Sequence, residues 1–301
     1  MTSPRSERRP EPDGELRLAV RPPFAADRLL SFLSARAVPG IEHVSVRTYR
    51  RSVRTADGAG CRLELTVDPS GPAVLLGVLG TDAAGSDPGG LVEAAVRLFD
   101  LDADPREIDA SLSADPALAP LVSAAPGTRV PRAVDGFELA VRAIVGQQVS
   151  VAGARATLGR VVARLGTPLE GAGPLTHLFP TPGAVAAASR EDLPMPAARA
   201  AAIRELARRV DAGALDLSAT ADLQAARAGL EAIPGVGPWT VGYVAMRALR
   251  DADAFPAGDL GVRHGIAALG LADDAGSIAA RAERWRPWRA YAVMHLWLHD
   301  G

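Results

Sequence analysis

The sequence predicts a chain of two regions with different fold classes: an α+β N-terminal domain, built from an antiparallel sheet with helices, followed by an all-α region. Length is the first observation, since 301 residues is about twice the size of one typical domain. The second is a change of pattern near residue 103, where alternating β-branched residues give way to Ala, Leu and Arg at helical spacing. We therefore divide the chain into a disordered polar leader at 1–14, the α+β domain at 15–103 and the all-α region at 104–301.

Strand-like and helical patterns follow one another in the N-terminal domain. Leu16, Leu18 and Val20 alternate with polar neighbours and predict a strand at 15–20. Short turns rich in Gly and Asp separate the later strands, which favours antiparallel pairing over a parallel βαβ unit. The other predicted elements are a helix at 25–38, three β-rich stretches at 42–55, 61–67 and 73–80, and a helix around 91–99.

Gly and Pro divide the second region into helical windows. Thr181 before Pro182 is an N-cap signal, and Ser189 with Asp192 resembles a capping box. The region shows no repeat period typical of a helical solenoid. The predicted helices lie at 135–145, 150–165, 182–188, 197–212, 221–232, 240–250, 260–269, 277–285 and 287–299, with a short turn at 191–193.

Composition excludes several classes of protein. Apolar runs are much shorter than the ~20 residues that span a bilayer, and no signal-peptide core follows Met1, so we expect a cytoplasmic protein without membrane contact. Every basic residue is an arginine, which excludes Schiff-base catalysis by a lysine side chain. The net charge of −2 gives no bulk sign of a polyanion-binding protein, so any contact with nucleic acid must be local.

The sequence predicts no metal site. Cys61 is the single cysteine, so neither a disulfide nor a four-cysteine metal centre can form within the chain. His295 and His299 are four residues apart, but no acidic residue lies between them, which favours core or surface packing over metal binding.

A glycine-rich hairpin is the most informative motif. Ile233-Pro234-Gly235-Val236-Gly237 lies between two helical patterns, and glycines there can adopt φ > 0. Successive backbone amides, with the N-terminus of the second helix at Thr240, could then converge on one phosphate without help from lysine. The alternative is an ordinary helical hairpin with a glycine-rich turn.

Asp259 follows a Phe-Pro-Ala-Gly turn and comes directly before the helical pattern at 260–269. It is predicted to cap that helix. One interpretation is that capping is the only role of its carboxylate. The same position near helix amides would favour an ionised carboxylate facing a cleft beside the hairpin, so capping and catalysis are compatible.

The hairpin, its tryptophan and the later aspartate resemble the helix-hairpin-helix DNA glycosylases. Three further segments are similar to the alkylated-base branch of that superfamily, the DNA-3-methyladenine glycosylase II family: AVRAIVGQQVSV at 140–151, FPTP at 179–182 and AERWRPWRAYAVMHLW at 282–297. The similarity covers roughly residues 15–300. It implies an all-α helix-hairpin-helix glycosylase core and a monofunctional enzyme that removes 3-methyladenine, together with 7-methylguanine, from double-stranded DNA.

The resemblance also assigns roles to individual residues. Asp259 stands where the family has its essential aspartate, which stabilises positive charge at C1′ and orients water. Lyase relatives carry a lysine after the hairpin, whereas Trp239 stands there in this chain, so strand cleavage is not expected. Gln148 occupies the position of the residue that fills the gap left by the flipped nucleotide, where well-known relatives have leucine.

Trp239, Tyr243 and Trp297 are the predicted walls of the base pocket. Trp239 and Tyr243 are four apart and share a helix face, while Trp297 stands at the family's stacking tryptophan. Electron-rich rings attract a cationic alkylpurine, although core packing is the alternative for each ring. We assign Trp285 and Trp288 to packing.

The expected protein is a monomer that requires no cofactor, with a monovalent cation at the hairpin carbonyls implied by the resemblance alone. Two other functions remain open at this stage. The hairpin could serve a non-catalytic protein that binds or surveys DNA, or the chain could be a uracil or thymine mismatch glycosylase, which shares the hairpin and aspartate.

Overall fold

The computed structural model describes residues 9–10, 15–55, 57–79, 88–171, 173–256 and 258–299. Its N-terminal part is a six-stranded sheet in the order β1-β2-β6-β5-β4-β3, and every neighbouring pair is antiparallel. The predicted antiparallel α+β domain is therefore confirmed. The strands are β1 (Arg9–Pro10), β2 (Leu16–Ala19), β3 (Glu42–Val44), β4 (Thr48–Arg54), β5 (Gly60–Val67) and β6 (Ala73–Leu79).

The leader predicted at residues 1–14 lies outside the described residues except at Arg9–Pro10. These two residues form β1 and pair with β2, so the structure has a strand where the sequence predicted no fold. A strand of two residues is too short to show an alternating pattern.

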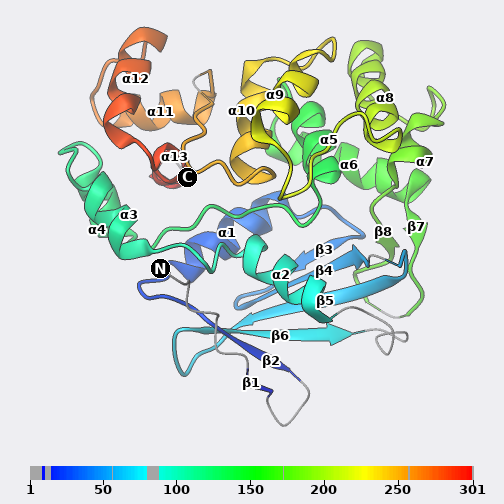
Figure 1. Ribbon diagram of the computed structural model, residues 1–301, viewed down its shortest axis with the longest axis horizontal. Coiled ribbons are helices and arrows are strands. Elements are labelled where there is room, and N and C mark those ends of the chain that lie inside the picture. Colours follow the sequence, from blue (N-terminus) through cyan, green and yellow to red (C-terminus); the bar gives the residue numbers. More distant parts are fainter. Residues whose placement is uncertain are drawn as a thin grey trace.

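Two helices lie between the sheet and the helical part of the molecule (Figure 1). They are α1 (Ala26–Arg36) and α2 (Pro88–Leu98). In α1 the buried side chains are Leu29, Leu30, Phe32 and Leu33, a helical stripe that packs onto β3 and β4. Arg36, at the last turn of α1, consequently lies close to the helices of the second region.

The second region is mostly helical, as predicted. It contains α3 (Pro105–Leu112), α4 (Ala119–Ala124), α5 (Gly136–Gly146), α6 (Val151–Leu165), α7 (Pro182–Ala186), α8 (Ala197–Asp211), α9 (Leu223–Glu231), α10 (Pro238–Arg247), α11 (Leu260–Ala268), α12 (Ala275–Ala282), a 3₁₀ turn (Glu283–Trp285) and α13 (Arg289–His299). In Figure 1, α5 to α10 form one group, while α11 to α13 lie with α3 and α4 in another.

Four elements correct the sequence prediction. The region is not wholly helical, because β7 (Thr167–Pro168) pairs with β8 (His177–Leu178). Two helices, α3 and α4, were not predicted. Asp104, which caps α3 ahead of Pro105, was a readable start signal, but α3 and α4 are only 8 and 6 residues long, which is too short for a clear helical period.

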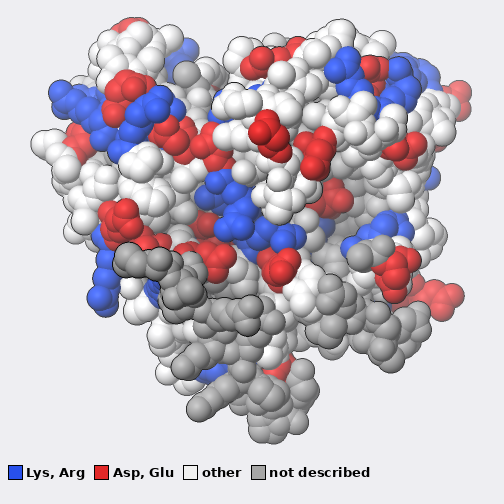
Figure 2. Space-filling view, viewed as in Figure 1, with Lys and Arg blue, Asp and Glu red and all other residues white. Residues whose placement is uncertain are grey.

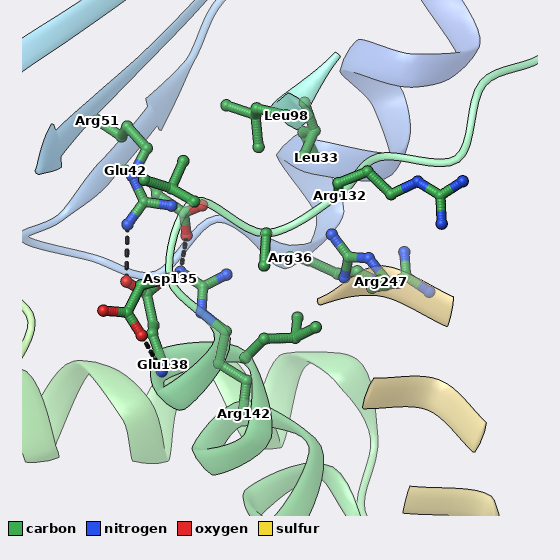
Figure 3. Close-up of a pocket in the computed structure, with 13 residues that line it drawn as sticks. Leu33, Arg36, Glu42, Arg51, Leu98, Arg132, Asp135, Glu138, Arg142 and Arg247 are labelled. Carbon is green, nitrogen blue, oxygen red and sulfur yellow. Dashed lines mark hydrogen bonds and ion pairs between the residues drawn. The ribbon is translucent and has the colours of Figure 1, made fainter. Parts of the chain in front are cut away.

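A buried ion cluster joins the sheet to α5 (Figure 3). Arg51 of β4 donates to Glu138 of α5 at 2.7 Å, and Arg142 of α5 pairs with both Glu138, at 2.7 Å, and Glu42 of β3. Burial alone would raise the pKa of Glu42, but Arg142 and Arg51 outweigh it and lower that pKa to about 2. The cluster fixes α5, whose C-terminal end carries Gln147 and Gln148.

Candidate active site

The hairpin between α9 and α10 has the predicted positive φ at one of its two glycines. Gly235 has φ +89°, whereas Gly237 is extended with φ −96°. The Val236 side chain is buried, and its amide donates to the Ile233 carbonyl at 3.0 Å, which closes the turn. Because Val236 anchors the loop from inside, only its backbone can face a ligand.

The first turn of α10 supplies the amide donors. Pro238 occupies the first helical position and has no N–H, so the amides of Gly237, Trp239 and Thr240 are those that a helix N-terminus leaves without a helical acceptor. The Thr240 side chain is buried, and its hydroxyl accepts from Gln147 Nε2 at 2.9 Å. Thr240 can therefore reach a phosphate through its amide rather than through its side chain.

Asp259 is the N-cap of α11, as predicted. Its Oδ1 accepts from the Val262 amide at 2.9 Å. Two indoles complete the arrangement: Trp239 Nε1 donates to Oδ2 at 2.6 Å and Trp297 Nε1 donates to Oδ1 at 2.7 Å. The side chain is 8% exposed and lines the cleft described below. Three donors from α10, α11 and α13 thus fix this carboxylate at the surface of the cleft.

A row of aromatic rings lies beside this carboxylate. Trp239 stacks on Tyr243 with ring centroids 5.3 Å apart, and Tyr243 lies 6.0 Å from Trp297. Phe32 of α1 stacks on Trp297 at 6.0 Å and 12°. The three aromatic residues predicted from the sequence are therefore brought together, and the structure adds a fourth, Phe32, from the N-terminal domain. Nothing local in the pattern of α1 distinguished Phe32 from a core residue.

Gly261 explains how the Trp297 indole can approach α11. A Cβ at this position would lie 2.7 Å from Trp297 Cδ1 and 3.1 Å from Asp259 Oδ1. Only glycine leaves room for the indole to reach the carboxylate, since real Cβ atoms essentially never come so close to another heavy atom. No motif in the sequence pointed to Gly261.

Asp259, Gly261 and the rings of Trp239, Tyr243 and Trp297 border one open cleft of about 1070 Å³, whereas Phe32 is buried behind them. Residues from α1, α5, α6, α10, α11, α13 and the hairpin line it, so it lies where the two groups of helices meet above α1. Its size and its aromatic and polar lining are typical of a site for a small organic group. Trp285 is not part of it: the indole is buried and donates to Asp115 at 2.9 Å, which confirms the packing role expected for that residue.

The two glutamines after α5 have different surroundings. Gln148 is exposed at the rim of the cleft with φ +55°, a left-handed conformation that is uncommon for residues other than glycine. Val149 and Val151 beside it are each 43% exposed. Gln147 instead points to the hairpin, where its Nε2 donates to the Gly235 carbonyl at 3.0 Å. Gln147, which the sequence analysis did not single out, ties the end of α5 to the hairpin.

Two arginines lie beside Tyr243. Arg247 Nη1 donates to the Tyr243 hydroxyl at 2.6 Å, and the guanidinium carbons of Arg36 and Arg247 lie 3.9 and 5.0 Å from the centre of the Phe32 ring. Burial would raise the pKa of the Tyr243 phenol, but Arg247 and Arg36 outweigh it and the pKa lies below its usual value. Burial also lowers the pKa of the Arg36 guanidinium.

Charges on the outer surface are mixed. On the face shown in Figure 2, arginines and acidic side chains are interspersed among uncharged residues. Among the residues that the structure describes, no three His, Cys, Asp or Glu side chains are grouped so as to hold a metal ion, and no helix is long and apolar enough to cross a membrane. His295 is buried in α13, where burial lowers its pKa to about 4.

Two family models match consecutive parts of the chain. Residues 15–135 match the AlkA N-terminal domain, and residues 141–290 match the HhH-GPD superfamily of base excision DNA repair proteins. The chain is 35% identical over 286 residues to DNA-3-methyladenine glycosylase 2 of Escherichia coli, covering 93% of this chain and 96% of that protein.

A Mycobacterium tuberculosis protein named "Probable bifunctional transcriptional activator/DNA repair enzyme AlkA" is 45% identical over 94% of this chain. This chain spans only 56% of that protein's length. Among solved structures, a 3-methyladenine DNA-glycosylase from Archaeoglobus fulgidus has the same fold, with a TM-score of 0.82, 23% identity, and 94% of this chain and 98% of that one covered.

Proposed function

We propose a reaction and a substrate class for this chain, which belongs to the AlkA type of DNA-3-methyladenine glycosylases within the HhH-GPD base-excision superfamily. The chain is a monofunctional DNA glycosylase. It excises 3-methyladenine, and also 7-methylguanine, from double-stranded DNA by base flipping and hydrolysis of the N-glycosidic bond. The observation that carries this proposal is the Asp259 carboxylate, fixed by three donors at a cleft with aromatic walls.

The cleft suits a base that has left the DNA stack. The rings of Trp239, Tyr243 and Trp297 offer electron-rich surfaces beside Asp259. An N-alkylated purine is cationic, so it gains cation–π attraction that an undamaged base lacks. Stacking and charge together favour the alkylated base.

Asp259 acts at the sugar. The C1′–N bond breaks with both electrons leaving on the base, so that the alkylpurine departs neutral while positive charge develops at C1′. A carboxylate beside C1′ stabilises that charge, and it can orient the water whose oxygen forms the new bond to C1′. The proton of this water passes to solvent, directly or through Asp259. The products are a free base and an abasic site.

The hairpin holds the DNA backbone. Amides of Gly237, Trp239 and Thr240 at the start of α10 can donate to one phosphate, and the helix dipole favours the anion. This contact is independent of sequence, as a damage-searching enzyme requires. Gln148, exposed at the rim, enters the duplex and fills the space of the flipped nucleotide.

The chemistry needs neither a lysine nor a cofactor. Trp239 occupies the position after the hairpin where a lyase would carry its amine, and the sequence contains no lysine, so the strand is left uncut. The carbonyl oxygens of Ile233 and Gly235 each accept one hydrogen bond and retain a second lone pair, which fits a monovalent cation that would face the phosphate. We further propose that the protein acts as a monomer.

The test is chromatography of the bases that the purified chain releases from methylated duplex DNA. We expect free 3-methyladenine and 7-methylguanine, with strands that break only after alkali treatment. Binding to abasic DNA without release of any base would support a non-catalytic DNA-binding protein instead. Release of uracil or thymine from mismatches, but of no alkylated base, would indicate a mismatch glycosylase.

A further inference from the structure

The charged side chains that line the cleft are mostly positive, although the whole chain has a net charge of −2. The arginines among them are Arg36, Arg142, Arg155 and Arg247. Of the described residues that line the cleft, Asp259 is the one with a carboxylate. A protein that binds a polyanion without an overall positive charge needs such a local concentration of basic side chains.

Three of these arginines already hold groups of the protein. Arg142 belongs to the ion cluster. Arg247 donates to the Tyr243 hydroxyl at 2.6 Å. Arg36 lies over the Phe32 ring, 3.9 Å from its centre. The protein itself therefore holds these three side chains in the walls of the cleft, and Arg155 is the fourth.

Arg155 lies on the face of α6 that borders the cleft. Val151, Ala154, Arg155 and Leu158 line the cleft at the spacing i, i+3, i+4 and i+7, which is one side of a helix. Val151 is exposed at the rim, whereas Leu158 is buried. The partly exposed Arg155 side chain thus begins one helical turn inside the mouth of the cleft.

The N-terminal domain orients the Arg155 guanidinium. Nε donates at 2.8 Å to the carbonyl oxygen of Ala37, which is the C-cap of α1. Within the described part of the chain, neither Nη atom of Arg155 has a hydrogen-bond or ion-pair partner. A planar group that is fixed at Nε and keeps both terminal nitrogens available matches two oxygens of one phosphate.

Arginines on the Asp259 side of the cleft are paired instead. Arg263 of α11 lies 3.1 Å from Asp273, and Arg289 of α13 lies 2.8 Å from Asp253. Each would have to leave a carboxylate before it could bind DNA. Arg155 has no such contact to give up.

We propose that Arg155 binds a second backbone phosphate of the DNA, separate from the phosphate held by the hairpin. This inference rests on the proposed glycosylase function and deepens it, because it adds α6 to the surface that binds the duplex. It also gives the N-terminal domain a part in DNA binding, through the Ala37 carbonyl.

The two phosphate contacts come from segments on either side of Gln148 in the fold. Gln147 bonds to the hairpin, and α6 begins after its cap at Ser150. Gln148 therefore lies between the segments that carry the two contacts. Phosphate contacts fix the position of a protein on the duplex. Two of them around Gln148 would hold the DNA while a nucleotide leaves the stack.

The test measures equilibrium binding to a duplex with a stable abasic-site analogue, at salt concentrations from about 50 to 200 mM. For Arg155→Met we expect about tenfold weaker binding, as for loss of a hydrogen bond to a charged group. The slope of log K against log salt concentration should become shallower by about 0.9, the value for one phosphate contact. Arg155→Lys keeps the charge but loses the planar fork, so it should keep the slope and bind more weakly than the wild type.

Arg160→Met is the matched control, since Arg160 is an exposed arginine of the same helix that does not line the cleft. It removes the same charge and should keep the wild-type affinity and slope. Equal changes in the two variants would indicate a long-range charge effect and overturn the inference. Loss of thermal stability in Arg155→Met with an unchanged slope would also overturn it, because Arg155 would then only hold α6 against α1.

Duplexes with one neutral methylphosphonate linkage at a time locate the phosphate, on the lesion strand or on the complementary strand. At one position the wild type should bind no better than Arg155→Met, and Arg155→Met should lose nothing further. Neutralising the phosphate at the hairpin should weaken both proteins. Absence of any position that affects the wild type alone would overturn the inference. Normal binding without release of 7-methylguanine would instead count against the proposed function.

Discussion

Two sets of charged side chains meet near α5, and they are built in opposite ways. In the ion cluster, Glu42 and Glu138 are surrounded by Arg51 and Arg142, and every charge has an opposite partner. In the cleft, Asp259 is held by indole and amide N–H groups and forms no ion pair within the described residues. The difference teaches that the paired charges join the sheet to α5, whereas the Asp259 carboxylate, which is held by uncharged donors, lines the cleft.

The largest expected effect on folding comes from breaking the ion cluster. Glu138→Gln removes one charge that faces both Arg51 and Arg142, so two buried guanidinium groups lose compensation. We expect the free energy of unfolding to fall by about 3–5 kcal/mol. Urea denaturation measures this.

Glu205→Gln is the control for that variant. Glu205 pairs with Arg208 and Arg209 on the surface of α8 and is more exposed than Glu138. Loss of its charge should lower the free energy of unfolding by about 1 kcal/mol or less. Similar losses for the two variants would mean that burial of the cluster contributes little to stability.

The cluster should also make stability depend on pH. The pKa of Glu42 is lowered from 4.5 to about 2, so its stabilising contribution is complete above about pH 4.5 and is lost as the pH falls toward 2. A shift of this size corresponds to about 3 kcal/mol. Unfolding measured at pH 6, 4 and 3 should therefore show a steeper loss in the wild type than in Glu42→Gln. Parallel curves for the two proteins would contradict the assigned pairing.

A smaller effect is expected in the cleft, on activity rather than on stability. Trp297→Phe keeps an aromatic ring beside Tyr243 and Phe32 but removes the Nε1 donor to Asp259. Loss of one hydrogen bond to a charged group is worth about 1.5–3 kcal/mol, so base release should slow at least about tenfold.

Trp288→Phe provides the comparison for Trp297→Phe. Trp288 packs edge-on against Tyr291 with ring centroids 5.8 Å apart and does not line the cleft. Its substitution should leave base release unchanged. A wild-type rate in Trp297→Phe would show that the indole does not position the carboxylate.

Whether the sequence predicted a feature depends on how local that feature is. The hairpin at Gly235 and the cap at Asp259 depend on a few consecutive residues, so glycine spacing and the position before a helix were sufficient to find them. Trp297 was placed by its resemblance to the family, and the structure brings it to Asp259 across 38 positions.

Features that arise only when distant segments meet were not predictable. Phe32 and Arg36 resemble any other residues of an amphipathic helix until α1 packs beside α13. The pairing of Glu42 with Arg142 joins residues 100 positions apart. The β7–β8 pair is too short to show a period. Each of these depends on tertiary contacts that no local pattern encodes.

The carboxylate of Asp259 is the centre of this account, and Asp259→Asn tests it most directly. Asparagine is as good an N-cap as aspartate, so α11 should remain capped while the negative charge is lost. Asp274→Asn is the control, because Asp274 caps α12 through the same bond, 2.9 Å from the Ser277 amide, without lining the cleft. We predict that Asp259→Asn binds duplex DNA but releases 7-methylguanine about 1000-fold more slowly, whereas Asp274→Asn keeps the wild-type rate. A wild-type rate of release in Asp259→Asn would contradict the account.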